Sequence, residues 1–534
     1  MLRVTIDQHA IDVPPGATVL AAARQLGIEI PTLCFLEGLR PSTSCLVCVV
    51  KIRNRNGLVP ACATQVVDGM QIDSETAEVH QARRTALELL LSDHVGDCLA
   101  PCHFACPAHM DIPLMLRQIT SDRLTEAIAT VKRDIALPAV LGRVCPKPCE
   151  KGCRRNAADG AVAVCQLKRY VADVDLASPS PYLPECKPDS GKRVAIVGAG
   201  PTGLSAAYYL RGLGHACTVF DDQKQPGGRL RRETSQEELP RDVLEAEIAQ
   251  ILRLGITLRP ETRVGHDPSD SNPSLDDLRR QFDAVLVACG STGKDQAHPW
   301  GLHAGAHGIQ VDKETYQTNL SGVFAAGNAI RTRGMVVRSV ADGKEAALAI
   351  DQYLAGGPVA GREKPFSSRI GKLEEGEIGQ FLTLAGKAPR QEPADQFEPG
   401  EAIEQAGRCL HCDCRALATC NLRRYAAQYG ADPNRFRGTR RRFRQIAQHA
   451  QVVYEPGKCI DCGLCIEIAA RAGEPLGLTF IGRGFDVQIG VPFNRTLEEA
   501  LGKVAAECVA ACPTAALAFQ RDPLPSQLPI LGQR

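Results

Sequence analysis

Apolar and polar residues alternate through MLRVTIDQHAIDVP at the start of the chain, on both sides of Gln8 and His9. This alternation predicts two strands joined as a hairpin. In the following ATVLAAARQLG the apolar positions recur with helical spacing. Residues 81–175 are predicted to be largely helical, and the Pro- and Ser-rich residues 174–190 to form a linker.

The apolar strand 194–197 leads directly into a glycine motif, Gly198-x-Gly200-x-x-Gly203, and then into an Ala-rich helix. A second short strand ends in Asp221, which lies 18 residues after Gly203. The first glycine permits a tight turn, the second lets the backbone approach a pyrophosphate, and the third lets the helix pack on the strand. Strand, glycines, helix, strand and acid in this order predict a dinucleotide-binding unit, although a glycine turn in an ordinary α/β unit is the alternative.

Length and composition narrow the functional classes. A chain of 534 residues suggests three or four domains, and a net charge of +1 gives no general attraction to nucleic acid or membranes. We find neither an apolar run that could span a bilayer nor a signal-peptide pattern, so a cytoplasmic protein is expected. Its 23 cysteines stand mostly in closely spaced groups, which in a reducing compartment indicates metal or iron–sulfur ligation.

The first cysteine group has the spacing C-x10-C-x2-C-x13-C and consists of Cys34, Cys45, Cys48 and Cys62. Four thiolates in a small β-rich domain can hold a [2Fe–2S] cluster, and zinc is the alternative. The spacing resembles the ferredoxin-like head of the large iron–sulfur subunit of respiratory complex I and of iron hydrogenases. This resemblance implies a β-grasp ferredoxin fold for residues 1–80.

The second group offers eight ligands, enough for two [4Fe–4S] clusters. They are His94, Cys98, Cys102, Cys106, Cys145, Cys149, Cys153 and Cys165. Because the cysteine of a Cys-Pro pair often serves the neighbouring cluster, we expect one cluster on Cys106, Cys145, Cys149 and Cys153, and the other on His94, Cys98, Cys102 and Cys165. A solvent-facing His94 and a merely apolar Cys165 are the alternatives. CHFACPAHMDIP and GRVCPKPCEKGC resemble the N-terminal domain of the glutamate synthase small subunit and of dihydropyrimidine dehydrogenase, which implies a helical double-cluster domain. In those proteins C-x2-C stands where this chain has His94 and Cys98, and the histidine is similar to the one that binds a cluster in the complex I subunit.

Further motifs resemble flavoproteins of the glutathione reductase class. Gly227-Gly228-x-Leu230 matches the glycine pair that approaches FAD, and SGVFAAGNAI matches the second flavin motif. Gly327 belongs to that motif, and Asn328 replaces the acid of the family. The resemblance implies a Rossmann-like FAD domain at 190–356. Relatives of the glutamate synthase small subunit insert an NADPH domain after the strand in 282–290, but about 30 residues cannot build a βαβ unit and its return.

The remaining sequence continues the iron–sulfur theme. Residues 357–400 are predicted to be a Gly/Pro-rich tether, and a strongly basic stretch after residue 420 to be a solvated face or a docking surface for an acidic partner. A [4Fe–4S] cluster or zinc is expected on Cys409, Cys412, Cys414 and Cys420. A ferredoxin-like [4Fe–4S] cluster is expected on Cys459, Cys462, Cys465 and Cys512, leaving Cys508 spare.

Together these patterns predict a multidomain α/β and α+β chain with a β-grasp head (1–80), a helical domain (81–175), an FAD domain (190–356), a linker (357–400) and an iron–sulfur domain (401–534). Its cofactors would be FAD, one [2Fe–2S] and about four [4Fe–4S] clusters, or about 18 irons. The mosaic resembles fused subunits of formate dehydrogenases, hydrogenases and bifurcating transhydrogenases. It implies an electron-transfer oxidoreductase subunit whose partner is an NADH- and FMN-binding subunit or a soluble ferredoxin. A self-sufficient NAD(P)H-dependent oxidoreductase acting on a small molecule, or a zinc-rich scaffold or nucleic-acid-binding protein, is the alternative.

Overall fold

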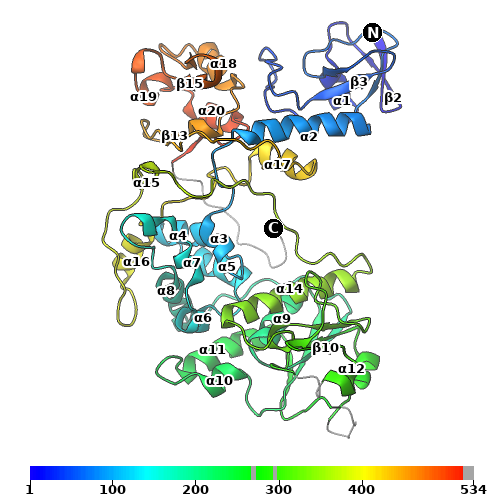
Figure 1. The fold of residues 1–534 in the computed structure, drawn as a ribbon, viewed down its shortest axis with the longest axis vertical. Coiled ribbons are helices and arrows are strands. Elements are labelled where there is room, and N and C mark those ends of the chain that lie inside the picture. Colours follow the sequence, from blue (N-terminus) through cyan, green and yellow to red (C-terminus); the bar gives the residue numbers. More distant parts are fainter. Residues whose placement is uncertain (266–271, 293–296, 521–534) are drawn as a thin grey trace. The chain divides into compact units, whose positions relative to one another are not determined.

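The computed structural model describes residues 1–265, 272–292 and 297–520 (Figure 1). The chain forms two compact units and passes between them several times. The first unit contains residues 1–100, residues 365–385 and the described residues from 410 onward. The second contains residues 101–364 and 386–409.

The first unit begins with a five-stranded mixed sheet in the order β2-β1-β5-β3-β4. The expected hairpin is present, because β1 (Leu2–Ile6) pairs antiparallel with β2 (His9–Val13). The other strands are β3 (Val49–Ile52), β4 (Leu58–Pro60) and β5 (Gln71–Asp73), and β5 runs parallel to β1. Helix α1 (Val19–Gln25) begins at a Thr18 cap and buries Val19, Leu20 and two alanines in the core under this sheet.

The rest of the first unit is built from the longer helix α2 and the C-terminal segment. Its helices are α2 (Ala77–Ser92), α15 (Glu377–Leu382), α17 (Asn421–Gln428), α18 (Leu464–Arg471), α19 (Leu497–Ala500) and α20 (Ala505–Ala511). Two small antiparallel pairs complete it, β13 (Val452–Tyr454) with β16 (Leu517–Phe519) and β14 (Thr479–Ile481) with β15 (Gln488–Gly490). Helix α2 therefore belongs to the first unit, although the sequence analysis assigned most of it to the helical domain at 81–175.

The second unit contains a five-stranded parallel sheet in the order β12-β9-β6-β7-β8. Its strands are β6 (Arg193–Val197), β7 (Ala216–Phe220), β8 (Thr257–Arg259), β9 (Ala284–Val287) and β12 (Val323–Ala325). Helix α9 (Pro201–Gly212) packs against α14 (Val336–Leu354), and α10 (Arg229–Glu233), α11 (Arg241–Leu252) and α12 (Leu275–Gln281) complete this part. The described residues between β9 and β12 hold a short 3₁₀ turn and the small β10 (Ala304–Gly305) and β11 (Gly308–Ile309) pair, with no second parallel sheet among them.

A group of short helices precedes the parallel sheet in the second unit. They are α3 (Pro101–Ala105), α4 (Ile112–Thr120), α5 (Leu124–Asp134), α6 (Pro138–Val144), α7 (Pro148–Lys151) and α8 (Val164–Ala177). Helix α16 (Pro399–Ala406) packs on α4 and α8. No helix in the described ranges is long and apolar enough to cross a membrane.

The segment expected to be a tether is divided between the two units. Residues 365–385 belong to the first unit, where Phe381 of α15 stacks on Phe443 with ring centroids 4.1 Å apart. Residues 386–409 belong to the second unit. Buried aromatic packing and a helix in a Gly/Pro-rich stretch show that composition alone was a poor guide here.

Candidate cofactor sites

The glycine motif forms the turn between β6 and α9, at the carboxyl end of the central strand. Gly198 has a φ of 109°, and a Cβ placed there would lie 2.5 Å from the carbonyl oxygen of Ala288. At Gly203 a Cβ would lie 1.9 Å from the carbonyl oxygen of Gly198, so the helix can approach the turn only without a side chain. By contrast, Gly200 has nothing within 4 Å of its Cβ position and lines an open cavity.

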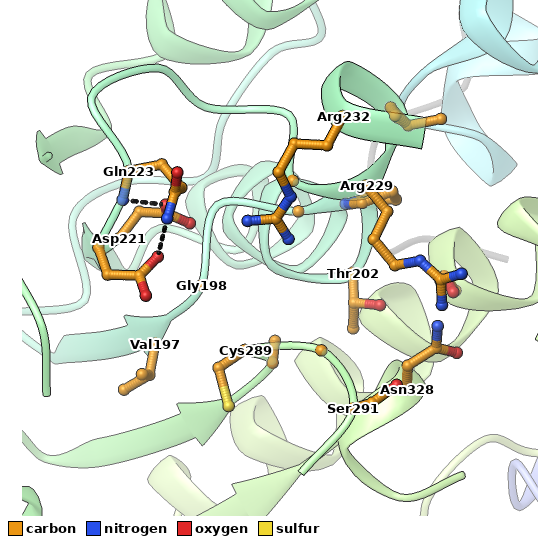
Figure 2. A pocket seen from close by; sticks show the side chains of 18 of the residues that line it. Val197, Gly198, Thr202, Asp221, Gln223, Arg229, Arg232, Cys289, Ser291 and Asn328 are labelled. Carbon is orange, nitrogen blue, oxygen red and sulfur yellow. Dashed lines mark hydrogen bonds between the residues drawn. The ribbon is translucent and has the colours of Figure 1, made fainter. Parts of the chain in front are cut away.

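Asp221 follows β7 and holds the glycine turn in place. Its Oδ2 accepts from the backbone amide of Ala199 at 2.6 Å, and its Oδ1 accepts from that of Gln223 at 2.8 Å. The carboxylate also lines the cavity (Figure 2). Asp221 thus orients the glycine turn in addition to the ribose-binding role that its position in the sequence predicts.

The second glycine pair meets the first motif. Gly227 and Gly228 have φ values of 120° and 53°, and the amide of Gly227 donates to the carbonyl oxygen of Ala199 at 2.9 Å. A Cβ on Gly228 would lie 3.0 Å from the Cα of Gly200. Leu230, in the first turn of α10, is buried and lines the same cavity.

The second predicted flavin motif, which contains Gly327 and Asn328, also contributes to the cavity wall. Gly327 has a φ of 68°, and a Cβ there would lie 2.2 Å from Oγ1 of Thr202 in α9. Asn328 lines the cavity, and its buried Oδ1 has no hydrogen-bond partner among the described residues. An orphaned amide oxygen of this kind fits a ligand that donates a hydrogen bond to it.

The cavity has a volume of about 590 Å³, within the range of cofactor sites. Four arginines that the sequence did not single out line it: Arg229, Arg232, Arg263 and Arg333. Figure 2 shows Arg229 pointing toward Asn328. An open glycine turn at a helix N-terminus, arginines and an unpaired amide together suit a ligand that carries phosphates and a polar ring, which is the chemistry of FAD.

The four thiols of the N-terminal domain lie together and are buried. Cys34 Sγ and Cys45 Sγ are 3.3 Å apart. The hydrogen bond with Cys45 lowers the pKa of Cys34, and the hydrogen bond with Cys62 lowers that of Cys48. The same hydrogen bonds raise the pKa values of Cys45 and Cys62, so without a metal each pair shares one proton between its two sulfurs.

In the second unit the structure brings Cys106, Cys145, Cys149 and Cys165 together. A hydrogen bond joins Cys145 to Cys165, and Cys149 interacts electrostatically with Cys106. The sequence-based grouping assigned Cys165 to the other cluster, whereas the structure places it beside Cys145. Helix α8 directs Cys165 at α6, where its Sγ lies 3.4 Å from the carbonyl oxygen of Gly142.

Two other cysteines of this group in the second unit, Cys102 and Cys153, pack on the same core. Cys102, on α3, and Cys153, after α7, are partly buried against it, as is Cys409. Helix α3 packs on α7 so closely that a Cβ at Gly152 would lie 2.8 Å from the Cβ of Ala105. Cys102 therefore lies on one of two helices in contact, and Cys153 lies two residues after the other.

Lys168 was missed by the sequence reasoning. It is buried one helical turn after Cys165. Burial works to lower its pKa, but the surrounding thiols of Cys165, Cys145 and Cys149 outweigh burial and raise it. Spacing of i, i+3 on a predicted helix places two side chains on one face, and this signal could have identified the lysine.

The predicted ferredoxin-like ligands also come together in the structure. Cys459, Cys462, Cys465 and Cys512 line one small cavity, with Cys508 at its edge. The amides of Asp461 and Leu517 donate to Cys459 Sγ and Cys512 Sγ, each at 3.4 Å. Amide donors to sulfur are a recurrent feature of iron–sulfur sites.

The run from Cys409 to Cys420 does not lie within one unit. Cys409 belongs to the second unit, whereas Cys412, Cys414 and Cys420 belong to the first. There, Cys414 and Cys420 lie close to Cys98. Among the described residues no three His, Cys, Asp or Glu side chains converge as the ligands of one metal ion do.

The basic stretch after residue 420 is largely paired within the chain. Arg435 bonds to Glu88, Arg441 to Asp93 and Arg442 to Glu374. Arg440 makes a buried ion pair with Glu377. These pairs neutralise much of the positive charge, which favours a structural role over a docking surface.

Family models match three consecutive parts of the chain. Residues 1–77 match a 2Fe-2S iron-sulfur cluster binding domain, residues 74–179 match dihydropyrimidine dehydrogenase domain II with a 4Fe-4S cluster, and residues 152–343 match pyridine nucleotide-disulphide oxidoreductase. The predicted order of a two-iron head, a four-iron domain and an FAD-type domain is confirmed by these matches. The chain is therefore a mixed α/β multidomain protein made of oxidoreductase domains.

Relatives of known name are subunits of larger enzymes. The chain is 38% identical over 246 residues to the beta subunit of an NADP(+)-dependent formate dehydrogenase from Moorella thermoacetica, covering 42% of this chain and 32% of that one. It is 35% identical over 234 residues to an NADPH-Fe(3+) oxidoreductase subunit beta from Geobacter sulfurreducens, covering 42% and 34%. It is 51% identical over 104 residues to the NADP-reducing hydrogenase subunit HndD from Solidesulfovibrio fructosivorans, covering 18% of each. The chain thus spans about a third or less of the length of these relatives.

Proposed function

We propose that this chain, which combines a 2Fe-2S domain, a 4Fe-4S domain and a pyridine nucleotide-disulphide oxidoreductase domain, is the iron–sulfur flavoprotein subunit of a multi-subunit oxidoreductase. It relays electrons between FAD and several clusters. FAD exchanges electrons in pairs or singly, whereas each cluster carries one, so the combination converts pair transfer into single-electron transfer. Relatives named as formate dehydrogenase and hydrogenase subunits support this class.

The observation that carries the proposal is the proximity of separate thiol sets within the first unit. Cys34 of the head interacts electrostatically with Cys462 of the ferredoxin-like set. Cys512 of that set interacts in the same way with Cys420. Three sites that lie far apart in the sequence are therefore neighbours, which is the arrangement that stepwise electron transfer needs.

The finer fold assignments are part of the proposal. A mixed five-stranded sheet with one helix under it supports a β-grasp ferredoxin head, and the parallel sheet with its glycine turn supports a Rossmann-like FAD domain. The two short antiparallel pairs around Cys459, Cys462, Cys465 and Cys512 support a ferredoxin-like C-terminal domain. FAD would contact Gly200, Asp221, Arg229 and Asn328, and one [2Fe–2S] and about four [4Fe–4S] clusters would occupy the thiol sets.

The route by which electrons reach the flavin is the second part of the proposal. The short connection between β9 and β12 leaves little room for a nicotinamide-binding domain. Electrons would then come from, or go to, a partner: an NADH- and FMN-binding subunit or a soluble ferredoxin.

The test is to purify the full chain anaerobically and measure flavin, iron, acid-labile sulfide and zinc. We expect bound FAD, about 18 irons and little zinc. Mixing with NADH or NADPH in a stopped-flow instrument should reduce the FAD slowly unless a partner subunit is added. Rapid reduction of the isolated chain would instead identify a self-sufficient NAD(P)H-dependent enzyme, and a colourless zinc protein without flavin would overturn the proposal.

A further inference from the structure

Two segments of the first unit that are far apart in the sequence bring cysteines of two different motifs together. The loop after α2 carries His94 and Cys98, and the segment before α17 carries Cys414 and Cys420. The backbone amide of Cys414 donates to the carbonyl oxygen of Cys98 at 3.1 Å. The thiols of Cys98 and Cys414 interact electrostatically with each other and with that of Cys420.

The three thiols have the surroundings of cluster ligands. Their residues are only 6%, 7% and 8% exposed, in the order Cys98, Cys414 and Cys420. The amide of Ser368 donates to Cys98 Sγ at 3.4 Å, and the amide of Arg423 donates to Cys420 Sγ at 3.4 Å. Cys420 is also the N-cap of α17, so the helix end favours a negative charge on its sulfur.

His94 offers a fourth ligand beside them. Its Nδ1 is sealed from solvent and has no hydrogen-bond partner in the described part of the chain. A Cβ placed on Gly96 would lie 3.1 Å from His94 Nε2 and 2.7 Å from Cε of Lys458, so these two side chains enclose Gly96. Lys458 is buried, forms an ion pair with Glu455 and interacts with Cys414, which places positive charge beside the thiols.

We propose that His94, Cys98, Cys414 and Cys420 are the four ligands of one [4Fe–4S] cluster. The assignment rests on the proposed function, and it differs from a local site on Cys409, Cys412, Cys414 and Cys420. Three cysteines and a histidine can also hold zinc, but zinc ligands converge on one ion, and no described group does so. Ligands of a four-iron cluster each bind a different iron, and a buried lysine offsets the negative charge of the thiolates.

The test compares single and double cysteine variants of the full chain, purified anaerobically. Cys98→Ala and Cys414→Ala should each lose about four irons and the same EPR signal of the reduced protein. The double variant should lose no more than either single variant, because both residues serve one cluster. A loss of about eight irons, two different missing EPR signals, or zinc in this position would overturn the assignment.

Two further variants separate the possible failures. Cys217→Ala is the matched control, since this buried thiol donates to the carbonyl oxygen of His215 and belongs to none of the cysteine groups; it should keep the full iron content. His94→Cys should keep the iron but shift the midpoint potential of that one EPR signal downward, because a thiolate replaces a neutral imidazole. An unaltered signal in His94→Cys would exclude His94 as a ligand, whereas a wild-type chain without iron or FAD would refute the proposed function itself.

Discussion

Lys168 and Cys165 share one acceptor, the backbone carbonyl oxygen of Leu141. The Nζ of Lys168 lies 3.0 Å from this oxygen, and the Sγ of Cys165 lies 3.5 Å from it. The ammonium group is thereby fixed beside the thiol set of the second unit, in a site almost closed to solvent. A fixed buried cation stabilises the more negative, reduced state of a nearby cluster.

Replacing this cation should make the adjacent cluster harder to reduce. We expect Lys168→Met to lower the midpoint potential of one [4Fe–4S] signal by roughly 50–100 mV, which corresponds to about 1–2 kcal/mol for a one-electron couple. EPR-monitored redox titration measures the change. Lys151→Met, at an exposed position in the same cysteine motif, is the control and should leave all potentials unaltered. Equal shifts in both variants would contradict the prediction.

Gly200 should control flavin binding without affecting packing. A methyl group at this position meets no protein atom within 4 Å, yet it projects into the cavity where the cofactor would lie. We expect Gly200→Ala to weaken FAD binding more than tenfold, or about 1.4 kcal/mol, while the iron content stays the same. Flavin fluorescence after gel filtration measures retention. Gly357→Ala, also without neighbours within 4 Å, should bind FAD as the wild type does; normal binding by Gly200→Ala would place the flavin elsewhere.

Glu247 should make stability depend on pH. Its carboxylate accepts from the amides of Ala139 and Val140, each at 2.7 Å, at the start of α6. Burial raises the pKa of Glu247 to about 7, and the amide bonds offset this only in part. Since an unfolded glutamate titrates near pH 4.3, the folded chain retains a proton that the unfolded chain loses between these two pH values.

The free energy of unfolding should therefore fall as the pH rises from about 4.5 to 7 and change little above that, by up to about 3 kcal/mol in all. The Tm of wild type and Glu247→Gln, compared across this range by circular dichroism, measures it. The variant cannot titrate, so the difference between the two proteins should vary with pH. A constant difference would show that Glu247 has an ordinary pKa.

The pairing of Arg440 should be structural. Its Nη2 donates to Glu377 Oε2 at 2.7 Å, and Glu377 also accepts from the amide of Phe443 at 2.6 Å. Arg440→Met should leave this buried carboxylate without its counter-ion and destabilise the first unit by about 3–5 kcal/mol, measured by denaturant unfolding. Arg444→Met, at an exposed position in the same stretch, should cost less than about 0.5 kcal/mol. If Arg444→Met weakened partner binding and Arg440→Met did not, the exposed arginines of this stretch would be a docking surface.

Local patterns predicted the local structure well. The expected strand at 194–197 corresponds to Arg193–Val197, and the helix expected in ATVLAAARQLG corresponds to Val19–Gln25. Both depend on residue periodicity and on glycine or capping chemistry within a few positions. The cavity residues Gly200, Asp221 and Asn328 were identified for the same reason, because each belongs to a short motif.

Groupings across the chain could not be predicted in the same way. Spacing shows which cysteines are able to bind metal, but not which of them meet after folding. Cys165 joins Cys145 because α8 packs on α6, and Cys98 meets Cys414 through a backbone hydrogen bond between segments more than 300 residues apart. The buried lysines Lys168 and Lys458 were missed because lysine is normally an exposed residue.

The alternation of the chain between its two units has a consequence for biosynthesis. The first hundred residues share a unit with residues that follow position 410, so this unit cannot be completed until those later residues have left the ribosome. At about 5–20 residues per second, the nascent N-terminal domain waits roughly 15 to 60 seconds for its C-terminal complement. During that interval Cys98 lacks Cys414 and Cys420, so a cluster at this site could be inserted only after residue 420 has been synthesised. A chain truncated before residue 410 would leave the Cys98 thiol without its partners and open to oxidation.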